Sequence, residues 1–97
     1  DIDVTQNKII YDIIQNDHYQ LRVSNPTPYH LNYSNITIFH DNKFTVLDLN
    51  QKNTVKPFSK EIYDIPLSGL SKKNELKIHF ILIDDQGVSH PYSAPIS

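Results

Sequence analysis

Two adjacent carboxylates, Asp84 and Asp85, are the residues whose type and spacing most suggest a chemical role. They follow an alternating apolar run and precede Gly87, which indicates a strand that ends in a turn. Paired carboxylates can transfer protons or bind a cation. However, neighbouring strand residues point to opposite faces, and no second acidic cluster lies nearby in sequence. We therefore expect no metal site here, and the pattern alone is typical of solvated turn formers.

The other reactive side chains show no catalytic or metal-binding arrangement. The five histidines, at positions 18, 30, 40, 79 and 90, lack the spacing of metal ligands, and we expect them on the surface. The chain has no cysteine to act as a nucleophile or a thiolate ligand, and its two glycines exclude a glycine-rich phosphate loop. No serine has a base at a recognisable spacing. We expect no cofactor and no enzymatic activity.

Length and charge narrow the class of protein. The 97 residues are enough for one domain, residues 1–97, and 9 basic against 11 acidic residues give a net charge of −2. This balance argues against nucleic acid and anionic membrane surfaces as partners, and no apolar run approaches the ~20 residues of a membrane-spanning helix. The chain begins at Asp1 without a methionine, so we expect a mature form or one domain of a longer protein, monomeric on its own.

Strand patterning dominates the elements that must position these residues. Alternation of apolar and polar residues predicts strands at 8–14, 19–25, 29–39, 44–49, 54–65, 75–84 and 88–93, with a polar loop at 68–74. The third strand changes phase near Ser34 and Asn35, which predicts a bulge. Pro57 interrupts the fifth strand, which is therefore predicted to lie at a sheet edge. About seven short strands at this spacing indicate an all-β, immunoglobulin-like β-sandwich.

The stretch Asn25-Pro26-Thr27-Pro28-Tyr29 separates two of these strands. Each proline fixes its own φ near −65°, favours an extended residue before it and removes one backbone donor. Such a stretch cannot continue a central strand, so we interpret it as a rigid corner rather than a binding motif. Either X–Pro bond is compatible with a cis or a trans peptide.

Two further patterns concern carbohydrate. Asn32-Tyr33-Ser34 and Asn35-Ile36-Thr37 match the N-glycosylation tripeptide, which chance also produces in an asparagine-rich chain. Six tyrosines are compatible with a glycan-binding surface, but Tyr19, Tyr29 and Tyr33 alternate in phase with the predicted core. We therefore expect these three rings to be buried.

Three segments resemble the second domain of the periplasmic pilus-assembly chaperones of chaperone–usher systems. LRVSNPTPYHLNYSNI (21–36) resembles the family's Asn-Pro-Thr-Pro-Tyr corner, VKPFS (55–59) its apolar-x-Pro-x-Ser segment, and ILIDDQG (81–87) its Ile-Asn-Asp-Tyr-Gly turn. Asp84 and Gln86 depart from that turn. The family's usual opening junction and the cysteine pair of some members are absent.

The resemblance implies a chaperone that binds pilin subunits in the periplasm and delivers them to an outer-membrane usher. In that family the first domain donates a strand to the subunit, and the second completes the cleft between the domains. It implies that Asp85 forms an ion pair with a basic residue at the domain junction, with Asp84 beside it, and that an isolated domain leaves Asp85 exposed. Residues 25–29, Pro57 and Gly87 then form the structural motif. The alternative is an immunoglobulin-like cell-surface adhesin or carbohydrate-binding module.

Overall fold

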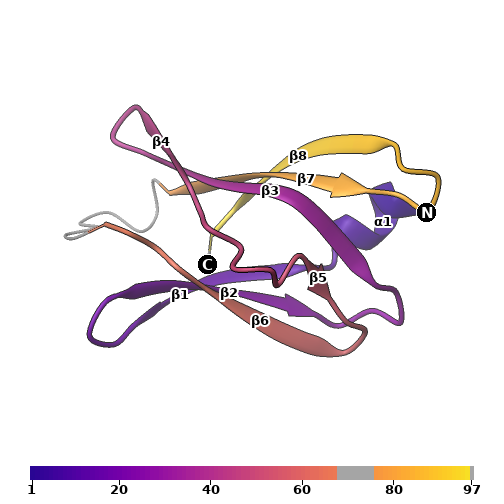
Figure 1. Cartoon of the computed structure of the whole chain (residues 1–97), viewed down its shortest axis with the longest axis horizontal. Coiled ribbons are helices and arrows are strands. Elements are labelled where there is room, and N and C mark those ends of the chain that lie inside the picture. The colour runs from indigo at the N-terminus through magenta and orange to yellow at the C-terminus, as the bar shows by residue number, and fades with distance from the viewer. Residues whose placement is uncertain (68–75, 97) are drawn as a thin grey trace.

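The computed structural model describes residues 1–67 and 76–96 and consists of two antiparallel β-sheets packed face to face (Figure 1). The elements are α1 (Ile2–Gln6), β1 (Ile10–Gln15), β2 (Tyr19–Asn25), β3 (Leu31–His40), β4 (Lys43–Val46), β5 (Thr54–Val55), β6 (Ser59–Asp64), β7 (Lys77–Ile83) and β8 (Ser89–Pro95). One sheet has the order β1-β2-β6. The other has the order β4-β3-β7-β8, and β5 also pairs with β3. The predicted β-sandwich is confirmed, whereas the polar loop predicted at 68–74 lies outside the described residues.

The alternating segments form strands because alternation places one side of each strand in the core. β2 has the predicted bounds, and its Leu21 and Val23 are completely buried. In β7, Ile78, Phe80 and Leu82 are at most 1% exposed, while the residues between them face outward. The strongest sequence pattern therefore marks the central strands of the two sheets.

The predicted bulge in the third strand is present at Ser34. Tyr33 pairs with Leu82 and Asn35 pairs with Ile81, so Ser34 is an extra residue opposite β7. The inserted residue reverses the side-chain phase of the strand. Tyr33 before the bulge and Ile36 after it consequently both face the core, at 2% and 0% exposure.

The segment at 54–65 is not one edge strand, as predicted, but two strands in opposite sheets. β5 pairs with β3 in the larger sheet, and β6 pairs with β2 in the smaller one. The chain crosses between the sheets around Pro57, which cannot donate to either ladder. Val55 and Tyr63, one from each strand, are both buried. Within the described part of the chain, β5 pairs only with β3 and β6 only with β2, so both halves lie at a sheet edge as predicted.

Tyr29 is 58% exposed, which contradicts the prediction that its ring is buried. β3 begins at Leu31 and not at Tyr29, so the alternation of the strand does not extend to the corner. Tyr33 is buried as predicted, and Tyr19 is half-buried against the core. The alternation of apolar and polar residues alone could not show that Leu31 belongs to the strand and that Tyr29, two positions earlier, belongs to the corner.

The N-terminal helix α1 was not predicted, because the chain is rich in β-formers and has one alanine. Its first turn is capped by Asp1, whose Oδ1 accepts a hydrogen bond from the Asp3 backbone N–H at 2.8 Å. The Tyr92 hydroxyl of β8 donates to the Asp3 carboxylate, which attaches α1 to the larger sheet. No helix within 1–67 and 76–96 has the length and apolar character needed to cross a membrane.

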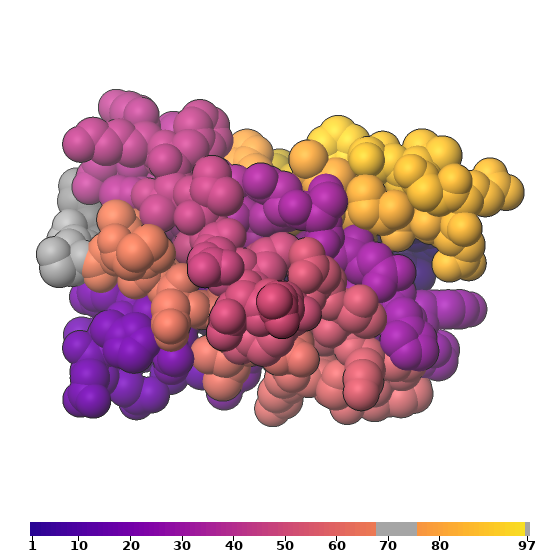
Figure 2. All heavy atoms as spheres, viewed as in Figure 1, coloured from indigo at the N-terminus to yellow at the C-terminus, as the bar shows by residue number. Residues whose placement is uncertain are grey.

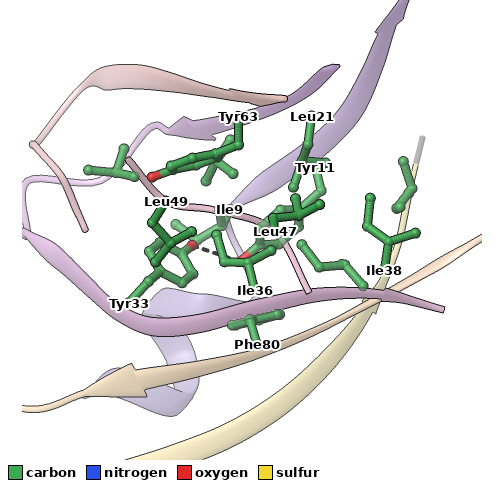
Figure 3. Packing of buried hydrophobic residues seen from close by; sticks show 14 of the residues in the cluster. Ile9, Tyr11, Leu21, Tyr33, Ile36, Ile38, Leu47, Leu49, Tyr63 and Phe80 are labelled. Atoms are coloured by element: carbon green, nitrogen blue, oxygen red, sulfur yellow. Dashed lines mark hydrogen bonds between the residues drawn. The ribbon is translucent and has the colours of Figure 1, made fainter. Parts of the chain in front are cut away.

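The core contains a hydroxyl pair between the two sheets. Tyr11 from β1 and Tyr33 from β3 point toward one another, and their hydroxyl oxygens are 2.8 Å apart (Figure 3). Phe80 packs against both rings, with centroids 5.1 Å from Tyr11 and 5.8 Å from Tyr33. Burial raises the pKa of both hydroxyls. The pair connects the sheets without leaving a buried hydroxyl unpaired.

Candidate functional site

A cleft of about 500 Å³ lies at the end of the sandwich that carries the N-terminus. Its walls are the start of α1, residues 28–32 after the proline corner, residues 82–85 at the end of β7, and His90. The space-filling view shows this hollow between the yellow β7–β8 turn and the magenta corner, with indigo N-terminal atoms behind it (Figure 2). The fold thus brings the proline corner (25–29) and the aspartate pair (84 and 85), at least 55 residues apart in the chain, to one site.

The proline corner is organised by the side chain of Asn25, which is 1% exposed. Its Nδ2 donates to the backbone carbonyls of Tyr29 at 2.7 Å, Lys56 at 3.1 Å and Val55 at 3.3 Å. Its Oδ1 accepts from the backbone N–H and the hydroxyl of Thr27, at 3.0 and 2.6 Å. Both ends of the amide are therefore used, as a buried amide requires.

Thr27 connects the corner to the crossing between the sheets. Its Oγ1 accepts from the Tyr29 backbone N–H at 3.3 Å, and its carbonyl accepts from the Phe58 backbone N–H at 3.1 Å. Pro26 and Pro28 have no N–H, so each proline removes a donor that would otherwise need a partner in this turn. The interpretation of the motif as a rigid corner fits this geometry, and no cis peptide occurs among the described residues.

Pro57 is the second residue of the turn that links β5 to β6. Phe58 follows it with a φ of 53°, and the Ser59 hydroxyl donates to the Lys56 carbonyl at 2.7 Å. Proline followed by a residue with positive φ is the sequence of a type II turn. Pro57 thus lies in the turn where the chain crosses from one sheet to the other, and this turn is bonded to the proline corner through Phe58 and Thr27.

Asp84 is the structural carboxylate of the β7–β8 turn. Its Oδ1 accepts from the backbone N–H groups of Gln86 and Val88, both at 2.9 Å, and its Oδ2 accepts from His90 Nε2 at 2.8 Å. The His90 hydrogen bond and then the backbone donors lower the pKa of Asp84. Sequence reasoning missed the role of His90, although a histidine six residues after an aspartate across a hairpin is a weak signal for such a pair.

Gly87 completes the same turn. Its φ is +80°, and its N–H donates to the Asp84 carbonyl at 3.0 Å. A Cβ at this position would have open space around it, so backbone conformation alone favours glycine. The predicted turn role of Gly87 is confirmed.

Asp85 lies beside Asp84 but has a different environment. It is exposed, as expected for an isolated domain, and it contributes to the cleft wall. Asp84 occupies the backbone N–H groups of Gln86 and Val88 in this turn, and no hydrogen bond of the Asp85 carboxylate occurs among the described residues. Together with Asp1 and Asp84, Asp85 gives the cleft three carboxylates against two histidines, His30 and His90. Such a surface attracts a basic group.

The remaining candidate residues do not form a second site. Tyr11, Tyr33 and Tyr63 are buried, so Tyr29 is a lone exposed tyrosine rather than part of a cluster. Within the described part of the chain, no three His, Cys, Asp or Glu side chains are placed to hold a metal ion. His30 is exposed as predicted, whereas His79 is only half-exposed and contacts the Phe44 ring at 5.4 Å between centroids.

The fold defines the chain as an immunoglobulin-like β-sandwich domain, and comparisons with known proteins define its family. A profile of the pili assembly chaperone PapD, C-terminal domain, matches residues 6–94. The chain is 37% identical over 68 residues to the probable fimbrial chaperone YadV of Escherichia coli (strain K12), a match that covers 69% of this chain and 26% of that protein.

Solved structures agree with this result. The crystal structure of the YadV chaperone has a TM-score of 0.78 at 28% identity, covering 93% of this chain and 42% of that chain. The Pseudomonas aeruginosa CupB2 chaperone has a TM-score of 0.74 at 19% identity, covering 97% of this chain and 42% of that chain, which shows the likeness of fold alone.

The chain belongs to the family of pili assembly chaperone C-terminal domains, which is a chaperone family and not an enzyme family. The resemblance found in the sequence is thereby confirmed. The chain spans about a quarter of the length of the fimbrial chaperone that it matches, and less than half of each solved chaperone.

Proposed function

We propose that the chain is the C-terminal domain of a periplasmic chaperone that binds pilin subunits and delivers them to an outer-membrane usher. In this proposal a preceding domain supplies the donor strand, and the present domain completes and orients the cleft between them. The family match over residues 6–94 supports the class. The exposed Asp85 in the carboxylate-lined cleft is the observation that carries the role of this domain.

The two neighbouring carboxylates, Asp84 and Asp85, have different roles in this proposal. Asp84 accepts three hydrogen bonds within its own turn, so its position is fixed and its charge is already partnered. Asp85 follows Asp84 on that fixed turn and lines the cleft. A basic side chain of the adjoining domain can pair with it, and the ordered turn lowers the entropy that the pair must lose.

The test uses the full-length protein from which this domain comes, co-expressed with a fimbrial subunit of the same organism. We expect the purified chaperone to hold the subunit in a one-to-one complex, measured by native mass spectrometry. Asp85→Asn should weaken the coupling of the two domains and lower the yield of the complex, by up to about fivefold if the pair has the strength of a good exposed ion pair.

The matched control is Asp17→Asn, which removes the same charge from an exposed residue between β1 and β2. Figure 1 shows that hairpin at the other end of the molecule from the N-terminus. Asp17→Asn should leave the complex intact. A wild-type protein that holds no subunit would contradict the proposed function, whereas equal behaviour of the two variants would contradict the role of Asp85.

A further inference from the structure

Two exposed aromatic residues are held by one residue, and one of them, Tyr29, lines the cleft. Tyr29 is 58% exposed and Phe58 is 71% exposed. The Tyr29 backbone N–H donates to Thr27 Oγ1, and the Phe58 backbone N–H donates to the Thr27 carbonyl. Thr27 is itself fixed by the buried amide of Asn25. Both aromatic residues therefore project from a rigid base, although they are 29 residues apart in sequence.

The backbone of Phe58 is in a conformation that an aromatic residue rarely adopts. Its φ is 53°, and it follows Pro57 in a turn whose third position favours glycine or asparagine. The ring gains little in return within this domain, because most of it faces solvent. Strained residues that persist without a packing reason are associated with functional surfaces.

A second exposed phenylalanine, Phe44, shows the contrast. It is 64% exposed, but its ring contacts Phe39 at 4.8 Å and His79 at 5.4 Å between centroids. Phe58 makes no such aromatic contact among the described residues. Phe44 also lies on β4, in the hairpin at the opposite end of the sandwich from the N-terminus (Figure 1). Exposure of Phe44 is thus partly explained by local packing, and exposure of Phe58 is not.

We propose that Phe58 and Tyr29 form a docking surface for the adjoining domain of the same polypeptide, which makes an apolar contact next to the ionic contact at Asp85. This inference rests on the proposed function. Tyr29 and Pro28 line the cleft, so the Tyr29 part of this surface is continuous with the carboxylates. The start of α1 forms another wall of the same cleft, so chain that precedes α1 arrives at this end.

The solved relatives contain enough additional residues to form such an adjoining domain. More than half of the solved YadV and CupB2 chaperones lies outside the match to this chain. An apolar rim around an ion pair excludes water from it and strengthens it, which is how mixed interfaces between domains obtain both affinity and orientation. The adjoining domain should therefore present an apolar side chain next to the basic group that faces Asp85.

The direct test is site-specific cross-linking in the full-length protein. Phe58 is replaced by the photoreactive amino acid p-benzoylphenylalanine, and Phe44 is replaced in the same way as the control. After irradiation, we expect position 58 to cross-link within the same polypeptide to residues outside this domain, several-fold more than position 44. Cross-links from position 58 only to a second copy, only to another protein, or at the level of position 44 would overturn the proposal.

A second variant separates docking from folding. Phe58→Gly removes the ring and places at this position the residue that the turn favours, so the melting temperature of the domain should be unchanged or higher. The full-length variant should nevertheless show a larger radius of gyration in small-angle scattering, as is also expected for Asp85→Asn. If Asp85→Asn loosens the domains and Phe58→Gly does not, the docking surface is wrong and the proposed function stands. If the wild-type chaperone binds no subunit, the proposed function itself is contradicted.

Discussion

The corner at residues 25–29 and the turn at residues 84–88 flank the same cleft but are stabilised in opposite ways. The corner depends on a buried amide, Asn25, which is 1% exposed. The turn depends on a carboxylate, Asp84, whose side chain is 28% exposed. Water can replace lost hydrogen bonds at an exposed turn but not in a buried corner. Loss of the organising side chain should therefore be costly at the corner and mild at the turn.

The difference also explains where an interaction site can arise. At the corner, the network uses both ends of the Asn25 side-chain amide and the hydroxyl, N–H and carbonyl of Thr27, and the ring of Tyr29 is exposed. At the turn, Asp84 accepts from the backbone donors, and a second acidic residue, Asp85, is exposed and lines the cleft. One region thus provides rigidity and apolar surface, and the other provides charge.

The largest effect is expected from Asn25→Ala. The change leaves three carbonyls and two donors of Thr27 without their partner in a site that excludes water. We expect the free energy of unfolding to fall by about 2–4 kcal/mol, measured by urea denaturation followed by circular dichroism. Asn25→Asp should be at least as harmful, because a carboxylate keeps the acceptor for Thr27 but presents a charge to three carbonyls.

The control for the two Asn25 variants is Asn32→Ala. Asn32 is exposed and its Oδ1 accepts from the Thr54 hydroxyl at 2.7 Å, so its loss should cost no more than about 0.5 kcal/mol. If Asn25→Ala and Asn32→Ala lower stability equally, the corner does not depend on the buried amide.

The next effect concerns the hydroxyl of Thr27. Thr27→Val keeps the shape of the side chain and removes the donor to Asn25 and the acceptor for the Tyr29 N–H. We expect a loss of about 1–2 kcal/mol in the same denaturation experiment. Thr27→Ser keeps the hydroxyl and serves as the matched comparison. A valine variant as stable as the serine variant would show that the backbone bonds alone hold the corner.

At the turn, the effect of Asp84→Asn should depend on pH. Hydrogen bonds from His90 and the backbone lower the pKa of Asp84 in the folded protein, so its ionised form stabilises the fold. This contribution is complete above the usual carboxylate pKa of about 4 and is lost as the pH falls through the lowered value. Thermal melts should therefore show the largest difference between wild type and variant near neutral pH, with the two curves converging in acid. A difference that does not change with pH would contradict this account.

The smallest effect on folding is expected at Asp85. Asp85→Asn should leave the free energy of unfolding unchanged at neutral pH, because the carboxylate is exposed and Asp84 makes the bonds of the turn. Its effect should instead appear in the full-length protein, as proposed above. If Asp85→Asn destabilises the fold as much as Asp84→Asn, the two carboxylates do not have separate roles.

Much of the fold could be predicted from the sequence where the signal is local. Alternation gave the bounds of β2, and the change of phase located the bulge at Ser34. The composition argument missed α1, because a single capping aspartate and the contact from Tyr92 outweigh weak helix propensity over five residues. The alternation also led to the wrong prediction that Tyr29 is buried, since nothing local marks where β3 begins.

The site was harder to predict because it depends on contacts across the sequence. The sequence identified the proline corner and both aspartates, but the amide of Asn25 bonds to carbonyls about 30 residues away. The assignment of 54–65 to one edge strand failed for the same reason: only the pairing of β5 with β3 and of β6 with β2 reveals the crossing. His90 as the partner of Asp84 likewise required the hairpin.

The partners of Asn25 have a consequence for how the corner tolerates change over evolution. Its amide donates to the backbone carbonyls of Tyr29, Val55 and Lys56, and every residue has such a carbonyl. The exposed side chains of Tyr29 and Lys56 can therefore be exchanged without loss of the hydrogen bonds, while Asn25 itself cannot. Selection on this corner should fall on one asparagine and its threonine, which leaves the surrounding surface free to diverge toward different partners.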